Sequence, residues 1–326
     1  MTNFWMHLEN EQLARSTVNC LETLVLLNGE RFSKEIWERT VLLFRHFFAA
    51  TLPKSLLTWE PDIRSSPEKT QGNFTVDYDG LANVEGRRNG SVQPDTIFSE
   101  QVVFCVVQSE LVDAVNSIVF GARKSSEDIV LSTTSSKDKF INGFDNCKSN
   151  NNGFFHIIEP ILLLSLCEAL GESQRLAKQF NDNNCQRTLL WKAGLRGSSK
   201  PNLIKQETHA LRAMLAILLR LLNDPRSDSV RDQVTKNVLS VVSAVFRGYS
   251  EADSDVRRTA YAHVVCELLQ ECLQLPSHLL PALGPEFPLR LCDLVEIAES
   301  QPLRSFLATL LRQFILTNNS FSIGHN

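Results

Sequence analysis

Apolar residues recur every three to four positions along most of the chain, and this spacing is typical of amphipathic helices. The first such stretch runs over residues 11–27 and ends at Asn28-Gly29, a common signal for a helix C-terminus. A second follows Ser33, a residue suited to cap a helix, and stops before Pro53. We expect the two to form an antiparallel pair. Their inward positions are Leu13, Val18, Leu21, Leu24 and Val25, then Ile36, Trp37, Val41, Phe44, Phe47 and Phe48.

The helical spacing is lost in two polar segments. Residues 60–95 are dominated by Asp, Gly, Asn, Arg and Pro, which predicts a flexible loop. Residues 122–153 are rich in Ser, Thr and Asn, which predicts a disordered insertion. The stretch between them, 96–121, is rich in valine and would also suit a buried strand. Its length without a turn signal favours a helix, with Val102, Val103, Val106, Leu111, Val115, Ile118 and Val119 facing inward.

From residue 154 onward, predicted helices follow one another with short links. Their expected spans are 160–170, 172–193, 201–223, 228–247, 254–274, 286–298 and 302–316. Helices of this length joined by short turns are typical of HEAT and armadillo stacks. We therefore predict an all-α, HEAT- or armadillo-like solenoid with two long polar insertions. Helical repeats would occupy residues 1–59 and 154–317, and 318–326 would be a tail.

Composition narrows the classes of function. The chain has 33 Lys and Arg against 37 Asp and Glu, a net charge of −4, which argues against a surface for nucleic acid. The most apolar stretch, residues 161–170, is too short to span a bilayer, so no membrane helix is predicted, and the N-terminus does not resemble a secretory signal. The 8 cysteines are scattered, which favours reduced, buried thiols in a cytosolic protein over disulfides or a zinc site.

Catalytic motifs are missing from the sequence. It has no phosphate-binding GxxxxGK[ST], no GxGxxG, no HExxH and no GxSxG. His46 and His263 lie between apolar helix neighbours, where a structural role is expected. We also expect Trp37 and the phenylalanines of the second helix to belong to the core; if exposed, they would form a helix-docking groove. We predict no catalytic residue, no cofactor and no metal.

One segment departs from ordinary helix. Residues 185–208 join two predicted helices by a glycine-rich, basic turn, and between Arg187 and Arg212 the local charge is 6 − 1 = +5. Such a turn could dock on acidic lipid headgroups or on an acidic partner. The candidate binding residues are Arg187, Lys192, Arg196, Lys200 and Lys205. The alternative is a purely structural joint, in which Gly194 and Gly197 serve turns, Pro201 starts the next helix and Trp191 anchors the joint.

This joint also carries a family resemblance. Residues 186–208, QRTLLWKAGLRGSSKPNLIKQET, preceded by ESQRLAKQFN at 172–181, resemble the far C-terminal region of the brefeldin A-inhibited guanine nucleotide-exchange proteins. These are large exchange factors that act on Arf GTPases through a Sec7 domain. Residues 8–40, 105–120 and 228–316 are similar to the helical repeats downstream of that domain, whereas the two polar segments lie outside the likeness.

The resemblance implies a function for the chain. It looks like the downstream, C-terminal part of such an exchange factor, and nothing in it matches the catalytic Sec7 domain. In the family, these helices are associated with membrane recruitment, autoinhibition and self-association at the Golgi. The expected partners are therefore an Arf-family GTPase through the parent protein, the trans-Golgi network membrane as a peripheral surface, and a second copy of the chain, with no nucleic acid.

Two other hypotheses remain open at this point. A stand-alone HEAT-type adaptor in intracellular transport fits the helical pattern equally well, and the block at 186–208 is what argues against it. An enzyme in its own right would need a pocket with perturbed acids that no motif indicates. The likeness already running at residue 8 also favours a fragment of a longer protein.

Overall fold

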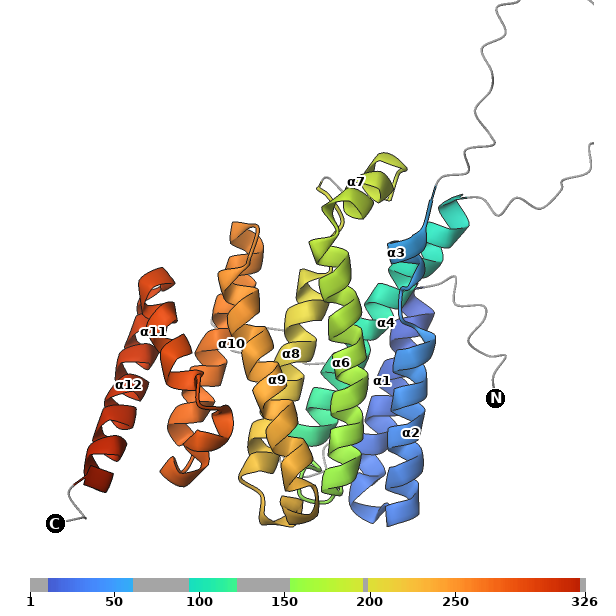
Figure 1. The fold of residues 1–326 in the computed structure, drawn as a ribbon. Helices are drawn as coiled ribbons and strands as arrows, with labels where there is room; N and C mark the ends of the chain where they lie inside the picture. The colour runs from blue at the N-terminus through green and yellow to red at the C-terminus, as the bar shows by residue number, and fades with distance from the viewer. Residues whose placement is uncertain (1–10, 61–93, 122–152, 196–198, 323–326) are drawn as a thin grey trace, which may run out of the picture.

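The computed structural model describes residues 11–60, 94–121, 153–195 and 199–322, and every regular element in those ranges is a helix (Figure 1). The predicted all-α helical solenoid is confirmed. The α-helices are α1 (Glu11–Asn28), α2 (Lys34–Ala50), α3 (Ser55–Thr58), α4 (Pro94–Phe120), α6 (Pro160–Asp182), α7 (Asn184–Lys192), α8 (Ile204–Leu222), α9 (Arg231–Ser250), α10 (Asp255–Gln274), α11 (Phe287–Ile297) and α12 (Gln301–Ser322). Short 3-10 turns occupy Gly29–Arg31 (η1), Pro225–Val230 (η3) and Ser277–Leu283 (η4).

Local capping explains several boundaries. The Ser33 hydroxyl accepts a hydrogen bond from the Ile36 N–H at the start of α2, as its position in the sequence predicts. Asn183 follows the end of α6, and its side chain accepts from the Gln186 N–H to begin α7. The predicted break near Gly171 is wrong, because α6 runs through it. A Cβ on Gly171 would lie 3.5 Å from the Met214 sulfur, an ordinary van der Waals distance, so the glycine neither ends the helix nor is required by its packing on α8.

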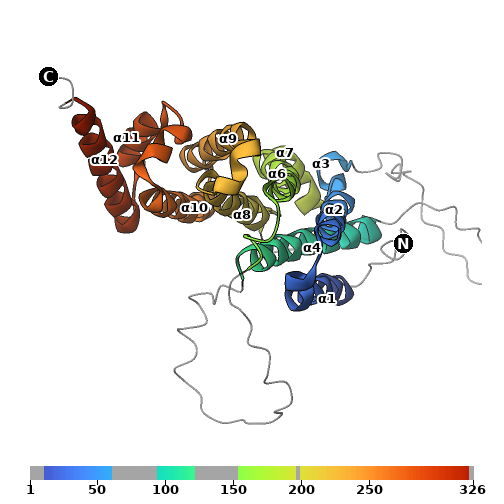
Figure 2. The same cartoon turned by 90° about the horizontal axis from the view of Figure 1, so that it is seen from below.

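The helices stack side by side from α1 and α2 at one end to α12 at the other (Figure 1). Seen from below, with the stack running across the picture, they fall into two layers, with α2, α6 and α9 in one and α4, α8 and α10 in the other (Figure 2). Neighbours in sequence are not always neighbours in space: α1 packs mainly on α4, whereas α2 packs mainly on α6. The helix between the two polar segments therefore joins the first helices to the rest of the stack.

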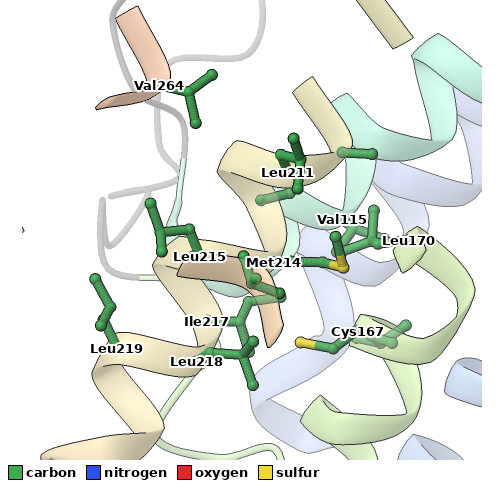
Figure 3. Close-up of a cluster of buried hydrophobic side chains, with 14 of the residues drawn as sticks. Val115, Cys167, Leu170, Leu211, Met214, Leu215, Ile217, Leu218, Leu219 and Val264 are labelled. Carbon is green, nitrogen blue, oxygen red and sulfur yellow. The ribbon is translucent and has the colours of Figure 1, made fainter. Parts of the chain in front are cut away.

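The core lies between the two layers. Figure 3 shows α8 at its centre, where Leu211, Leu215 and Leu218 point at neighbouring helices. Met214 lies close to Val115 of α4, and α8 also packs on α6, α9 and α10. One continuous apolar cluster reaches from Ala14 in α1 to Leu310 in α12. The expected core aromatics of α2 (Trp37, Phe44, Phe47 and Phe48) are buried in it, which removes the groove alternative.

The sequence predicts no apolar helix long enough to span a membrane, and α4 corrects that prediction. Phe98–Phe120 is long and apolar enough to cross a membrane by length and composition, with a mean hydropathy of 1.6. Half of that window is buried in the fold, and α4 packs against α1, α6 and α8. Buried core helices can be equally long and apolar, so the packing of α4 accounts for its apolar composition.

Some residues predicted to face inward are exposed. Leu13 and Leu24 of α1 are 51% and 52% exposed, and Ile36 and Val102 are exposed as well. The reason is position: α1 lies at the end of the stack and packs on α4 through one face (Ala14, Val18 and Val25). A terminal helix of a solenoid can carry a second apolar face that single-helix periodicity does not distinguish from the first.

Of the described cysteines, Cys167 and Cys272 are buried, as expected. Burial raises the pKa of both thiols, which makes them unreactive. Cys20, Cys185 and Cys292 are exposed, so the prediction of buried thiols holds for only part of the set.

Candidate interaction site at the α6–α7–α8 joint

The basic segment of the sequence forms the short helix α7 and the turn that leads into α8. In Figure 1, α7 lies beyond the ends of α6 and α8, at the edge of the stack where α3 also lies. Asp182 and Glu207 flank the segment, and no acidic residue lies between them in the sequence. The joint therefore carries cations on an element that projects from the stack.

The inner side of α7 is held by apolar packing. Leu190 and Leu195 are buried with Leu56, Phe98 and Phe180 in a small cluster separate from the main core. The backbone ends α7 in a Schellman motif: the N–H of residue 194 donates to the carbonyl of residue 191, and that of residue 195 donates to the carbonyl of residue 190. Residue 194 is a glycine with φ of 99°, which a side chain would strain.

Polar side chains fix the same side of α7. Arg187 donates from Nε to the Pro201 carbonyl at 2.8 Å and from Nη1 to the Asn181 carbonyl at 2.9 Å. Gln186 donates from Nε2 to the Trp59 carbonyl at 2.8 Å, which ties α7 to the end of α3. Arg187 is half-buried and engaged by the fold, so of the five candidate binding residues it is a structural one.

Beneath the joint lies a buried charged cluster, which sequence reasoning missed. Glu207 is fully buried at the start of α8 and accepts from Arg257 Nη2 at 2.9 Å and from the Tyr261 hydroxyl at 2.5 Å, both on α10. Its other oxygen accepts from Asn181 Nδ2 at 2.6 Å. Arg257 also pairs with Asp182 at the end of α6, at 2.8 Å. The cluster thus links three helices.

The cluster shifts the pKa values of its members in the direction that keeps the ion pairs. Burial alone would lower the pKa of Arg257, but hydrogen bonds and charge from Glu207 and Asp182 raise it. Burial alone would raise the pKa of Asp182, but hydrogen bonds from Lys178 and Arg257 lower it. Burial and the Glu207 carboxylate raise the pKa of Tyr261, so its hydroxyl stays protonated. Both acids that flank the basic segment are therefore engaged by Arg257.

Asn181 connects this cluster to the turn above it. Its side-chain oxygen accepts from the Leu203 N–H at 2.7 Å, while its amide nitrogen donates to Glu207 and its backbone carbonyl accepts from Arg187. One hint was present in the sequence: Glu207 is the lone acid between Arg187 and Arg212. Its partner Arg257 lies 50 residues away, a distance that helical periodicity does not bridge.

The remaining described lysines of the joint are less engaged by the fold. Lys192 and Lys205 are exposed, and Lys200 is half-buried and donates to Asn184 Oδ1 at 3.1 Å. Trp191, expected to anchor the joint, is instead exposed over 42% of its surface; Leu190 and Leu195 hold the joint.

The other predicted residues of the joint have different outcomes. Pro201 precedes the helix instead of starting it, because α8 begins at Ile204. Arg196 and Gly197 lie outside the described residues.

Elsewhere the described residues offer little for catalysis. They contain no group of three or more His, Cys, Asp or Glu side chains that could hold a metal ion. His46 and His263 are both exposed. A hollow of about 270 Å³ lies where α9, α10 and α12 meet, and the carboxylate of Glu299 and the guanidinium of Arg258 in its wall pair with each other at 3.4 Å.

Comparison with known proteins agrees with the likeness seen at the joint. The family model described as BIG2 C-terminal domain matches residues 106–312, and so includes α7 and the charged cluster. The chain belongs to the family of brefeldin A-inhibited guanine nucleotide-exchange proteins. It is 31% identical to brefeldin A-inhibited guanine nucleotide-exchange protein 1 of Homo sapiens and of Rattus norvegicus, over 94% of its own length.

A more distant relative extends the comparison to yeast. The ADP-ribosylation factor guanine nucleotide-exchange factor sec72 of Schizosaccharomyces pombe is 24% identical over 83% of the chain. No solved structure matches the chain. The chain spans only 18% of the length of the mammalian relatives and 14% of the yeast one, so their named activity belongs to much longer proteins.

Proposed function

We propose that this chain is a regulatory, non-catalytic scaffold portion of a Golgi Arf exchange factor, and that it supports membrane recruitment, autoinhibition or self-association in vesicle trafficking. The observation that carries the proposal is the match to exchange factors over 94% of the chain, together with a family model for their C-terminal domain. In this proposal the catalytic Sec7 domain lies outside the chain, and Arf is a partner only through the parent protein.

The form of the joint supports a binding role. Its inner contacts use leucines, carbonyl groups and an ion-pair cluster, so these groups serve to fix the joint in place. Its outer side presents Lys192, Lys200 and Lys205, which suit an anionic surface such as the cytoplasmic leaflet of the trans-Golgi network. Lys192, Lys200 and Lys205 are the proposed contact residues.

The first helix supports the self-association part of the proposal. Leu13, Leu24 and Leu27 of α1 are all more than half exposed, and with Cys20 they form a stripe beside the face that packs on α4. Exposed apolar ends of helical stacks favour association, because only contact with another surface removes them from water. A second copy of the chain is the proposed occupant. Sedimentation velocity on the chain and on Leu24→Lys tests this, and equal behaviour of the two would contradict it.

Nucleotide exchange on Arf tests the main proposal. The chain alone, an isolated Sec7 domain and the two mixed are compared by the rate of GDP release from Arf in solution. We expect no exchange by the chain alone and a changed rate in the mixture. The control is an equal concentration of an inert protein of similar size, which separates a specific effect from crowding by added protein.

The outcomes have distinct meanings. A changed rate in the mixture supports a regulatory portion of an exchange factor. An unchanged rate in every mixture contradicts regulation of exchange and favours an independent helical adaptor in transport. Exchange by the chain alone would overturn the non-catalytic part of the proposal.

A further inference from the structure

The outer face of α7 combines an exposed tryptophan with cations. Asn184 and Trp191 are seven residues apart on the helix and therefore share one face. Lys200 donates from Nζ to Asn184 Oδ1, so its ammonium group lies over the face that Trp191 occupies. Lys192 is the next residue along the helix, and it is exposed as well.

The two sides of α7 differ in how firmly they are held. Leu190, Leu195, Gln186 and Arg187 fasten the inner side to α3, to the end of α6 and to the turn before α8. Trp191 has 42% of its surface exposed, although a ring of its size would normally be buried more fully in a core of this kind. A fixed helix thus presents an unburied indole, which lowers the entropic cost of binding through it.

The charge of this region is uniform. Between residues 183 and 206 the sequence has five Lys or Arg and no acid. The two acids that flank it, Asp182 and Glu207, are both paired with Arg257 beneath the joint. Nothing acidic in the segment itself neutralises Lys192 or Lys205.

We propose that α7 is an interfacial membrane finger, in which Trp191 enters the headgroup region of an anionic lipid bilayer while Lys192, Lys200 and Lys205 contact lipid phosphates and carboxylates. This inference rests on the proposed membrane role and assigns it to a residue and an insertion mode. Tryptophan favours the membrane–water interface because its indole is apolar in body and polar at its N–H. Lysines beside it add attraction to an anionic leaflet.

The shape of the joint favours lipid over an acidic peptide. A helical or extended peptide binds in a groove that covers it on two sides. Helix α7 instead stands beyond the ends of α6 and α8 (Figure 1), and its outer face carries a single large apolar side chain. An exposed indole followed along the chain by the exposed lysines Lys192 and Lys205 matches a soft, anionic surface that needs no complementary shape.

Quenching by brominated lipid tests the insertion directly. The full chain is mixed with vesicles of phosphatidylcholine and phosphatidylserine whose acyl chains carry bromine, and tryptophan fluorescence is recorded. Of the 4 tryptophans, Trp37 is buried, so quenching by lipid reports on the others. We expect quenching in the wild type that is lost in Trp191→Phe and absent with vesicles of phosphatidylcholine alone.

Co-sedimentation with the same vesicles measures how much each side chain contributes to the binding affinity. Trp191→Ala should weaken binding by about tenfold, and Lys192→Gln or Lys205→Gln by about fivefold each. Lys236→Gln, on an exposed lysine of α9, is the matched control and should bind as the wild type does. Circular dichroism of each variant shows that folding is intact, which is expected because Trp191 contributes little to the core.

Three results would overturn the finger. Quenching that persists in Trp191→Phe would place another tryptophan at the lipid. Binding to anionic vesicles without any quenching would reduce the site to surface attraction by lysines. No binding to anionic vesicles would reject lipid as the partner. The exchange assay with Arf and Sec7 in solution contains no vesicles, so failure of the finger and failure of the proposed regulatory role are seen separately.

Discussion

Arg226 lies in the turn between α8 and α9 and makes several hydrogen bonds to the segment before α6. Its guanidinium donates to the carbonyls of His156 (2.6 Å), Ile158 (3.2 Å) and Phe155 (3.0 Å), and it pairs with Asp224. These contacts fasten the segment that enters α6 to the turn between α8 and α9. Asp224 is buried and also accepts from the Arg226 N–H, so one carboxylate orients the arginine that makes all of these bonds.

Replacing Asp224 should therefore make stability less dependent on pH. Burial alone would raise the pKa of the Asp224 carboxyl, but hydrogen bonds from Arg226 outweigh it and the pKa lies below its ordinary value. A lowered pKa stabilises the fold above the ordinary value of about 3.9, and this contribution is lost as the pH falls towards the folded value. We expect Asp224→Asn to lower the free energy of unfolding by about 1–2 kcal/mol at neutral pH and by less in acid.

Urea denaturation at several pH values measures this difference. The control is Asp228→Asn, because Asp228 pairs with Arg231 at the surface with 77% of its side chain exposed and should matter little at any pH. A penalty for Asp224→Asn that stayed constant down to strong acid would mean that the charge of Asp224 is not what stabilises the turn.

At the scale of elements, the ion pair between Glu207 and Arg257 fixes how α8 and α10 meet. Both side chains are almost fully buried, and Asn181 carries the link on to α6. A Cβ on Gly248 would lie 2.0 Å from the Tyr261 ring, so a glycine on α9 makes room for this tyrosine of the cluster. Buried ion pairs contribute little net stability but are costly to break from one side, so this one favours a single register of the helices.

The costs of removing Glu207 and of removing Arg257 should not add. We expect Arg257→Leu to cost about 3–5 kcal/mol in the free energy of unfolding, because it leaves the Glu207 carboxylate buried without a positive partner. Glu207→Leu should cost less, because Arg257 keeps Asp182 as a partner at 2.8 Å. The double variant should cost clearly less than the sum of the two. Chemical denaturation of all four proteins forms the cycle, and simple additivity would show that the two charges do not interact.

Helix boundaries and the buried aromatics of α2 were predictable, because capping and periodicity act over a few residues. The exposure of Leu24 and the continuity of α6 through Gly171 were not, because both depend on which helix lies alongside. At the joint, the basic residues could be found from composition, but Arg187 and Trp191 have opposite roles that only packing decides.

At the scale of the whole molecule, Gly121 and Gly153 lie side by side although 31 residues separate them in the sequence. A Cβ on Gly153 would lie 2.3 Å from the Gly121 nitrogen, so the two backbones touch. The Phe154 N–H donates to the Ile118 carbonyl at 2.8 Å and the Phe155 N–H to the Val119 carbonyl at 3.0 Å. The stack is therefore closed at this point by its own hydrogen bonds, whatever length of chain runs between the two glycines.

Shortening that segment should leave the fold intact. Because loop closure costs only about 0.6 kcal/mol for each doubling of length, replacing residues 122–152 by a linker of about four glycines and serines should raise the free energy of unfolding by no more than about 2 kcal/mol. Thermal unfolding followed by circular dichroism measures the change. Loss of a cooperative transition in the shortened chain would show that the segment contributes to the fold.

Because the backbones of Gly121 and Gly153 lie in contact, the chain between them is a suitable place to insert another folded domain. A reporter whose own termini lie close together, such as a fluorescent protein, could be inserted between these glycines without displacing the helices. The insertion site lies at the end of α4, whereas the joint packs on Phe98 near the start of the same helix. An inserted fluorophore would therefore be separated from the joint by the length of α4 and would not obstruct it.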